Sequence, residues 1–472
     1  MKTLVWFRRD LRLHDHAALS YASKNSEEVY AVFVFDRHIL SKLTDKKDSR
    51  LQFIHDSLIE MEETLQKNGS SIKICDGIPE EEIPRYAKEL KVSAVYTNRD
   101  YEPYAKARDH KVAQNLKELG IDFHTFKDSV IFEAKETLKD DGTPYRVFTP
   151  YMRKWMSCLH EQGDQVEDFQ VNLKKMAHWN NSESISQIDW IKRLGFENTP
   201  PHFKAATQAA LKRQKDFLQI ISDYDRLRDF PAADGTSNLS VYIRHGNLSV
   251  RDMVRASQTG KSIGHQKWLS EIVWREFYQY ILDCFPHVEK QSFKPEYDSI
   301  KWRGGERELQ AWKKGETGFP IVDAAMRCLA ATGTMPNRLR MVVASFLCKT
   351  LLVDWRQGEK WFAAKLLDFD LAANNGGWQW SASSGVDAQP YFRIFNPYSQ
   401  SQKFDPQGNF IRTWCPELSN LDEKFIHEPH KLSPLEQQLN GCLIGSDYPA
   451  PIVDYAKKRN EALTMYQEAV KL

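Results

Sequence analysis

The sequence lacks an excess of charge of either sign. It contains 65 lysines and arginines against 64 aspartates and glutamates, which gives a formal net charge of +1 over 472 residues. A surface that is basic throughout is therefore excluded, and any contact with nucleic acid must depend on a local patch. Hydrophobic residues make up 41% and charged residues 27% of the chain, which is typical of a soluble globular protein.

Cysteines and long apolar runs are also scarce. The seven cysteines form no C-x-x-C pair and no zinc-site spacing, so we predict reduced thiols and no metal site. The amino-terminal residues lack the apolar core of a signal peptide, and no run approaches the length of a membrane span. We therefore expect a cytoplasmic protein that does not contact membranes.

A glycine-rich phosphate loop is absent from the first 128 residues. The first apolar run, residues 4–7, is followed by Arg8-Arg9-Asp10-Leu11-Arg12 instead of G-x-G-x-x-G, which excludes the standard dinucleotide-binding turn. Further apolar runs lie at 29–35, 72–74, 94–96 and 123–126, and helical patterns between them at 51–67 and 105–119. This alternation predicts an α/β domain over residues 1–128, with a doubly wound parallel sheet covered on both faces.

The pattern changes twice after residue 128. Residues 129–200 are irregular, with a turn at 140–144, a polar run at 180–184 and two prolines at 200–201, which favours an interdomain linker. From 201 to 472 helical periodicity dominates, and nine of the thirteen tryptophans lie there. We predict a large all-α domain, and two domains suit the chain length. The tryptophans suit a flat cofactor, although a large helical core also uses them as filler.

Residues 368–380 combine polar groups with small and aromatic residues. Asp368, Asp370 and Asn374 lie near two glycines and two tryptophans, and buried charges and amides are costly unless they are paired. A planar ligand with several ring heteroatoms would satisfy these groups. The alternative is a helix that ends at Gly376-Gly377, with solvated aspartates.

Three further stretches carry candidate chemistry. Residues 234–240 offer hydroxyls and a glycine before a helical run, which suits either a phosphate or a plain helix cap. On a predicted helix over 268–278, Trp268, Glu271 and Arg275 share one face with Trp274 nearby; they either clamp a flat substrate or form an i, i+4 ion pair. Residues 336–341 fit a nucleic-acid contact or a surface turn.

Nine motifs in order resemble the DNA photolyases of the cryptochrome/photolyase family. They are WFRRDLRLHD (6–15), NRDYEP (98–103), the 236–240 segment, WREFY (274–278), TGFPIVDAAMR (317–327), NRLRM (337–341), DWRQGEKWF (354–362), DLAANNGGWQW (370–380) and PYFRIFNP (390–397). The resemblance spans nearly the whole chain. It implies a light-driven enzyme, specifically of class I, that repairs cyclobutane pyrimidine dimers, with FAD in the helical domain below a cavity for a flipped-out dimer.

The resemblance also implies roles for individual residues. The expected FAD-binding residues are Tyr224, Arg228, Thr236, Ser237, Ser240, Arg275, Arg340, Asp368, Asp370 and Asn374. The expected substrate- and DNA-binding residues are Glu271, Trp274, Asn337, Arg338, Met341, Trp380, Arg393 and Lys403. The expected catalytic residues are Glu271 and Asn374, with Trp302, Trp355 and Trp378 as the electron relay.

Several of these roles have a physical rationale. The neutral amide of Asn374 suits flavin N5 when the ring is reduced and anionic. Glu271 would bind the pyrimidine edge, whereas Trp274 and Trp380 would stack on the two thymine rings, which is worth about 1–3 kcal/mol per base in other single-strand binders. Met341 resembles the cyclobutane-dimer enzymes, since (6-4) enzymes use histidines and the single-strand-preferring branch uses glutamine there.

The resemblance leaves the second chromophore open. A folate or a deazaflavin is expected in the α/β domain, but Tyr104-Ala105 replaces the Asn-Glu pair of the folate pattern. In the 236–240 segment of the expected FAD site, Asn238 replaces a basic residue that would contact a phosphate. We expect a monomer in the bacterial cytosol, at the nucleoid when it binds UV-damaged DNA.

Two alternative functions stay open. One is a cryptochrome-like photosensor, which is disfavoured by Asn374 and the absence of a long tail. The other is a flavin electron carrier that never binds DNA.

Overall fold

The computed structural model describes residues 1–180 and 184–470, and the chain forms two compact units. Unit 1 comprises Met1–Ser222 and Ser237–Cys284, and unit 2 comprises Asp223–Thr236 and Phe285–Leu472. The middle of the predicted polar connector, residues 181–183, lies outside the described residues. The division into units does not follow residues 128 and 200, so those functional boundaries stay a prediction.

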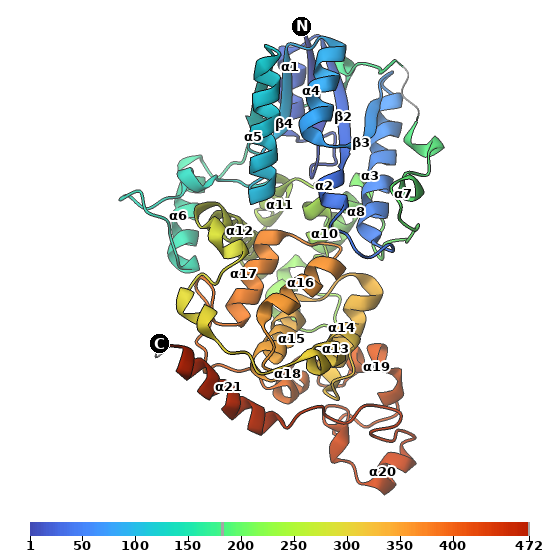
Figure 1. The fold of residues 1–472 in the computed structure, drawn as a ribbon, viewed down its shortest axis with the longest axis vertical. Helices are drawn as coiled ribbons and strands as arrows, with labels where there is room; N and C mark the ends of the chain where they lie inside the picture. Colours follow the sequence, from blue (N-terminus) through green and yellow to red (C-terminus); the bar gives the residue numbers. More distant parts are fainter. Residues whose placement is uncertain (181–183, 471–472) are drawn as a thin grey trace. The chain divides into compact units, whose positions relative to one another are not determined.

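A five-stranded parallel sheet forms the centre of unit 1 (Figure 1). Its strands are β1 (Lys2–Phe7), β2 (Glu28–Asp36), β3 (Ile72–Gly77), β4 (Ala94–Asn98) and β5 (Asp122–Phe126), in the order β3-β2-β1-β4-β5. Each strand contains one of the apolar runs named above. The predicted α/β fold is therefore confirmed, with the order reversing between β1 and β4.

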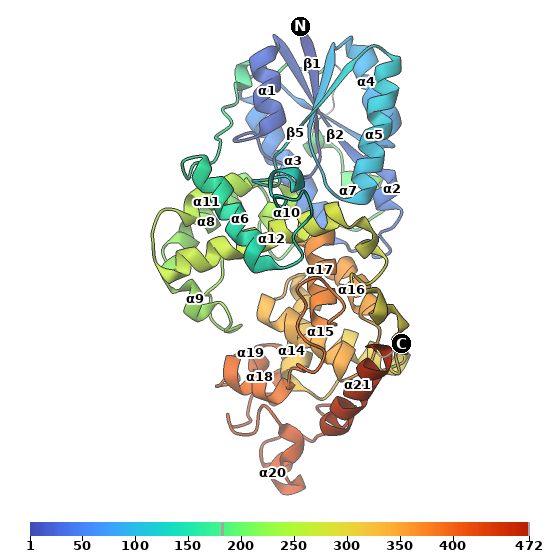
Figure 2. The same ribbon diagram turned by 90° about the vertical axis from the view of Figure 1, so that its left-hand side faces the viewer.

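Helices cover both faces of this sheet (Figure 2). Val5 and Phe7 pack against α1 (Ala17–Asn25) and α3 (Ser49–Gln66). Leu4 and Trp6, which alternate with them, pack against α4 (Pro79–Leu90) and α5 (Pro103–Glu118). Because strand side chains alternate between faces, one unbroken apolar run serves both layers. The short α2 (Arg37–Leu40) follows β2.

Residues 129–222 add helices to unit 1 instead of an extended connector. They include α6 (Phe148–Glu161), α7 (Trp190–Arg193) and α8 (Thr207–Leu218). Trp155 on α6 is fully buried, and the Trp179 indole donates to the Ala31 carbonyl of β2 at 2.8 Å. On α6 the buried residues Phe148, Tyr151, Trp155 and Leu159 follow helical spacing, a signal that the interpretation of this region as irregular overlooked.

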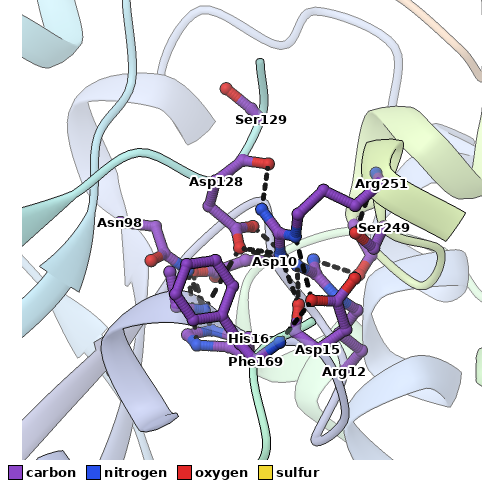
Figure 3. Close-up of polar contacts among 12 residues, drawn as sticks. Asp10, Arg12, Asp15, His16, Asn98, Asp128, Ser129, Phe169, Ser249 and Arg251 are labelled. Atoms are coloured by element: carbon purple, nitrogen blue, oxygen red, sulfur yellow. Dashed lines mark hydrogen bonds and ion pairs between the residues drawn. The ribbon is translucent and has the colours of Figure 1, made fainter. Parts of the chain in front are cut away.

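Three more helices of unit 1 come from the second stretch of chain, α10 (Ser240–His245), α11 (Val250–Ser257) and α12 (Ile263–Cys284). A buried ionic cluster joins α11 to the end of the sheet (Figure 3). Arg12 donates to both carboxylate oxygens of Asp128 at 2.8 Å. Arg251 donates to Asp128 at 2.8 Å and to Asp15 at 2.9 Å. Burial opposes ionisation of Asp128, but the guanidiniums of Arg12 and Arg251 outweigh it and hold the pKa well below its usual range.

Unit 2 is helical. It contains α9 (Tyr224–Leu227), α13 (Glu306–Lys314), α14 (Pro320–Thr332), α15 (Asn337–Lys349), α16 (Trp355–Lys365), α17 (Leu371–Ser381), α18 (Pro397–Phe404), α19 (Asn409–Trp414), α20 (Pro434–Leu439) and α21 (Tyr455–Val470). The predicted all-α architecture of this region is confirmed. Among the described residues, no helix has the length and apolarity that a bilayer crossing requires.

The motif at 317–327 has a structural role in unit 2. The buried Asp323 carboxylate accepts from the Thr317 N–H at 2.7 Å, the Gly318 N–H at 2.9 Å and the Tyr448 hydroxyl at 2.6 Å. It thus joins α14 to the preceding turn and to the carboxyl-terminal segment. Burial raises the pKa of Asp323 to about 6, although these donors act in the opposite direction.

Candidate active site

The turn at 234–240 precedes a helix, as predicted. Gly235 is required because a Cβ there would lie 2.3 Å from the Leu227 Cβ. Asn238 has a φ of +50°, a conformation that asparagine tolerates better than most residues. Helix α10 begins at Ser240, and no side chain caps it at Leu239. The hydroxyl residues therefore do not act as a conventional N-cap, and Ser240 is exposed.

Tyr224 and Arg228 lie at the start of the unit 2 segment that precedes this turn. The Arg228 guanidinium lies 5.2 Å from the centre of the Tyr224 ring. Asp229 lies 3.8 Å from the Arg228 Nε and accepts from the Arg338 Nη2 at 2.8 Å. Two residues predicted for different partners, Arg228 for the cofactor and Arg338 for DNA, therefore share one carboxylate that the sequence had not indicated.

Helix α12 of unit 1 carries three candidates, Glu271, Trp274 and Arg275. Glu271 forms an ion pair with Lys267 at 3.3 Å, one turn earlier on the helix. Arg275 donates to the Ser129 carbonyl at 2.7 Å. Trp274 is half-buried and stacks on Phe148, with 3.7 Å between ring centres and an interplanar angle of 10°.

One member of the predicted α12 cluster does not belong to it. Trp268 is only 2% exposed and packs against Phe217, with ring centres 5.1 Å apart. The expectation that both indoles would face a cavity is therefore wrong for Trp268, which is a core residue. Its position three residues before Glu271 fits a helical stripe, and such spacing does not distinguish core residues from cavity residues.

Arg340 and Asp368 form a largely buried ion pair in unit 2. The Arg340 Nη2 lies 2.8 Å from Asp368 Oδ2 and 3.1 Å from Oδ1, while its Nε donates to the Met335 carbonyl at 2.8 Å. The Asp368 side chain is 4% exposed, so the alternative of a solvated aspartate is wrong here. Pairing of a buried carboxylate with a guanidinium holds α15 against the start of α17.

Helix α17 presents Asp370 and Asn374. Asp370 caps the helix by accepting from the Ala373 N–H at 3.1 Å. The helix continues through Gly376 and Gly377 to Ser381, so the alternative of a helix end at the glycines is also wrong. A Cβ at Gly377 would have no atom within 4 Å, which means that the side of the helix at Gly377 is not packed against a neighbour.

Asn374 is buried and has a partner that the sequence did not indicate. Its Nδ2 donates to the Glu359 side chain and to the Glu359 carbonyl, both at 3.1 Å. Burial raises the pKa of Glu359 to about 7. Glu359 lies within the DWRQGEKWF motif, four residues after Trp355 on α16. Nothing in the sequence pairs α16 with α17 at this point.

The three predicted relay tryptophans share one core. Trp355 and Trp378 are each 2% exposed, and Trp302 packs against the same cluster. Among residues 1–180 and 184–470, none of the three rings contacts another; Trp378 instead contacts Phe362 at 5.0 Å and Trp312 at 5.9 Å between ring centres. Trp312 had not been singled out from the sequence.

The predicted DNA-binding residues differ in exposure. Asn337, Arg393 and Lys403 are exposed, whereas Met341 and Trp380 are half-buried. Arg338 is partly covered by Phe404, whose ring centre is 4.5 Å from the guanidinium. The segment that presents Arg393 is anchored by Lys349, whose ammonium donates to the Ser383 hydroxyl at 2.8 Å and to the Arg393 carbonyl at 3.2 Å.

Several charged residues of the α/β domain lie at or near the carboxyl ends of β1, β2 and β4. Arg8 contacts both carboxylate oxygens of Asp109 at 2.6 Å. Tyr104, the residue that departs from the folate pattern, donates its hydroxyl to Asp36 at 2.7 Å. Ligands of open α/β sheets bind near such a reversal of strand order, so these residues mark the expected place of a second chromophore without identifying it.

Comparisons with known proteins agree with this layout. A family model described as DNA photolyase matches residues 3–170, and one described as the FAD binding domain of DNA photolyase matches residues 268–468. A deoxyribodipyrimidine photo-lyase from Alkalihalophilus pseudofirmus is 37% identical, over 98% of this chain and 97% of the relative.

Solved structures give the same result. A class III photolyase from Agrobacterium tumefaciens has a TM-score of 0.91 and 35% identity, covering 100% of this chain and 98% of its own. A cryptochrome from Synechocystis has a TM-score of 0.85 and 28% identity, covering 98% and 99%. With the sheet, the helical unit and the motifs in place along the whole chain, this protein belongs to the DNA photolyase family.

Proposed function

We propose that this protein uses light to revert cyclobutane pyrimidine dimers in UV-damaged DNA, with FAD as its cofactor. The observation that carries the proposal is the 37% identity with a deoxyribodipyrimidine photo-lyase over nearly the full length of both chains. When bound, reduced and photoexcited FAD supplies the electron that opens the dimer ring and then receives it back.

The polar and charged side chains of the proposed site fit FAD. Hydroxyls at Thr236, Ser237 and Ser240 and the uncapped start of α10 suit phosphates, and the Arg340–Asp368 pair supplies fixed charges. The proposed FAD-binding residues are Tyr224, Arg228, Thr236, Ser237, Ser240, Arg275, Arg340, Asp368, Asp370 and Asn374.

Asn374 and Glu271 carry the proposed catalytic roles. The Asn374 Nδ2 donates to Glu359. Its side-chain carbonyl oxygen therefore stays available to accept a hydrogen bond from flavin N5 when that nitrogen carries a proton. Glu271 on α12 would hydrogen-bond the pyrimidine edge of the dimer and stabilise the charge that develops on it. Trp302, Trp355 and Trp378 would reduce the resting cofactor.

DNA recognition is proposed for eight residues that the sequence motifs indicate. They are Glu271, Trp274, Asn337, Arg338, Met341, Trp380, Arg393 and Lys403. Trp274 already stacks on Phe148 with one face, so the proposal requires the opposite face of the indole to receive the base. Few cations are involved, so the affinity for DNA should depend only modestly on salt.

The finer assignments are part of the same proposal. Met341 supports a cyclobutane dimer as substrate but does not separate class I from class III, and the likeness to a class III photolyase makes that class the alternative. A second chromophore, folate or deazaflavin, is proposed for the α/β domain of residues 1–128. A monomeric state and a cytoplasmic location stay predictions.

A cryptochrome-like photoreceptor is the alternative function. The observation that favours it is the likeness to the Synechocystis cryptochrome, with a TM-score of 0.85. The 28% identity to that protein is below the 37% identity to a photo-lyase. A photoreceptor would bind FAD and respond to light yet leave dimers intact.

The test uses the purified protein and a UV-irradiated thymine oligonucleotide. We expect a flavin absorption spectrum, and loss of dimers under blue light with a reductant but not in darkness. Flavin binding without dimer loss would favour the photoreceptor. A colourless protein that also fails to take up added FAD would contradict both functions. A further near-UV or violet band would reveal a second chromophore.

A further inference from the structure

A groove follows the outer edge of the sheet in unit 1, remote in sequence from every residue proposed above for FAD or DNA. It has a cavity volume of about 650 Å³. Its floor is β3, one wall is α4 and the other wall is the segment 187–193, which includes most of α7. We name it the β3-edge groove. The sheet continues on only one side of its floor, because β3 is the last strand in the order β3-β2-β1-β4-β5 (Figure 1).

The outer edge of β3 has no backbone partner among the described residues. Residues Ile72–Gly77 pair with β2, in the register Ala31↔Ile72 to Asp36↔Gly77. Across the described ranges 1–180 and 184–470, no hydrogen bond joins their backbone to any other strand or loop. An edge strand of this kind presents the N–H and C=O groups of alternate residues, which a further extended chain can bind.

The walls of the groove are aromatic surfaces covered by guanidiniums. Arg85 lies 4.1 Å from the centre of the Tyr86 ring on α4, and Arg193 lies 4.9 Å from that of Trp190 on α7. Both rings are largely buried. Side chains that alternate along a bound strand would therefore meet a guanidinium held over an aromatic ring on each side of the strand.

The charges that line the groove are unbalanced. Its two carboxylates have partners, since Asp76 accepts from Arg37 at 2.8 and 3.0 Å and Glu82 pairs with Arg85. Lys73 and Arg193, by contrast, have no carboxylate partner within the part of the chain that the structure describes. An occupant of this groove therefore meets two uncompensated positive charges.

We propose that the β3-edge groove binds an extended acidic peptide segment of a partner protein, which adds a sixth strand to the sheet at β3. Backbone hydrogen bonds would supply affinity, and the charges of Lys73 and Arg193 would select acidic side chains. A second copy of this chain is the less favourable occupant, because its own Lys73 and Arg193 would then lie against Lys73 and Arg193 of the first copy and repel them.

Fluorescence anisotropy of the holoprotein tests the proposal. The probe is a fluorescein-labelled peptide of alternating valine and glutamate, and the comparison peptide alternates valine and lysine. We expect saturable binding of the acidic peptide only, with affinity that falls as salt is added. The double variant Lys73→Glu/Arg193→Glu should weaken binding at least tenfold, and Lys73→Gln should weaken it less. Lys117→Glu, on the exposed surface of α5 outside the groove, should leave it unchanged.

Amide hydrogen exchange shows whether the peptide pairs with the strand. The amides of residues 72–77 should exchange more slowly when the acidic peptide is present, because the unpaired edge becomes hydrogen-bonded. The proposal fails if no peptide binds, if the basic peptide binds equally well, or if exchange at 72–77 does not change. It also fails if light scattering shows a dimer that Lys73→Glu/Arg193→Glu dissolves. Flavin absorbance and dimer repair stay intact in each variant, so the outcome is separate from the proposed function.

Discussion

At the scale of single residues, Lys349 is the least expected group in unit 2. It is fully buried at the end of α15, and its partners are a hydroxyl and a carbonyl rather than a carboxylate. Burial lowers its pKa to about 7. A charge without a counter-ion at this depth destabilises the folded chain, yet it anchors the segment that carries Arg393.

Lys349→Met should change how stability depends on pH. The lysine pKa in the unfolded chain is about 10.4, so between pH 7 and 10 the unfolded state binds more protons than the folded state. The contribution of Lys349 to the free energy of unfolding therefore rises with pH, by at most about 1.4 kcal/mol per pH unit. Urea unfolding at pH 7, 8 and 9 should show the wild type gaining stability relative to Lys349→Met. Parallel pH profiles for the two proteins would contradict the lowered pKa.

Trp378→Phe tests the proposed relay. We expect the variant to lose photoreduction of oxidised flavin while it still repairs dimers after chemical reduction, because the indole would serve only electron supply. Trp312→Phe is the matched control, since Trp312 is fully buried and its ring centre lies 5.9 Å from that of Trp378. Transient absorption should show photoreduction retained in Trp312→Phe. Equal photoreduction in both variants would remove Trp378 from the relay.

At the scale of elements, the fold was predictable wherever a pattern repeats along the chain. All five strands and the helices α3 and α5 follow from apolar runs and helical periodicity. Helix α6 was not predicted, although its buried residues Phe148, Tyr151, Trp155 and Leu159 follow helical spacing. The partnership of Asn374 with Glu359 was not predictable either, since it depends on how α16 and α17 pack. The sequence motifs identified the candidate residues, but only the folded structure shows which residues they contact.

A comparison of the caps of α17 and α16 distinguishes a structural role of Asp370 from a role in FAD binding. Asp370→Ala removes the helix cap and should cost about 1 kcal/mol of unfolding free energy. Asp354→Ala removes the equivalent cap of α16, where Asp354 accepts from the Arg356 N–H at 3.0 Å, and should cost a similar amount. Only Asp370→Ala should also lose FAD affinity, measured by flavin retained during dialysis. Equal retention in the two variants would leave Asp370 a cap and nothing more.

At the scale of the whole molecule, the ionic cluster of Figure 3 holds together segments that are far apart in sequence. Asp128 follows the last strand, whereas Arg251 lies on α11, 123 residues later. The sequence predicted neither this pairing nor the membership of residues 237–284 in unit 1, because a pair so far apart leaves no local signal.

Asp128→Asn should destabilise the protein by about 3–5 kcal/mol near pH 7, because it leaves two buried guanidiniums short of a counter-charge. The native pKa of Asp128 is depressed, so its contribution is present above the unfolded value of about 3.9. It is lost as the pH falls from there towards the native pKa, so the difference between the two proteins should begin to shrink below about pH 4. Urea unfolding from pH 3 to 7 measures this. Glu197→Gln, in an exposed pair with Lys47, should change stability by less than about 1 kcal/mol.

The chain passes between the two compact units three times, after Ser222, Thr236 and Cys284. During synthesis on a ribosome, the sheet of unit 1 is therefore complete by residue 126 while its cluster still lacks Arg251, and the nascent unit stays unfinished until residue 284 has emerged. Domains usually fold in the order in which they are made. Here a fragment cut anywhere between residues 128 and 236 would release Asp15 and Asp128 with no arginine from α11 to neutralise them.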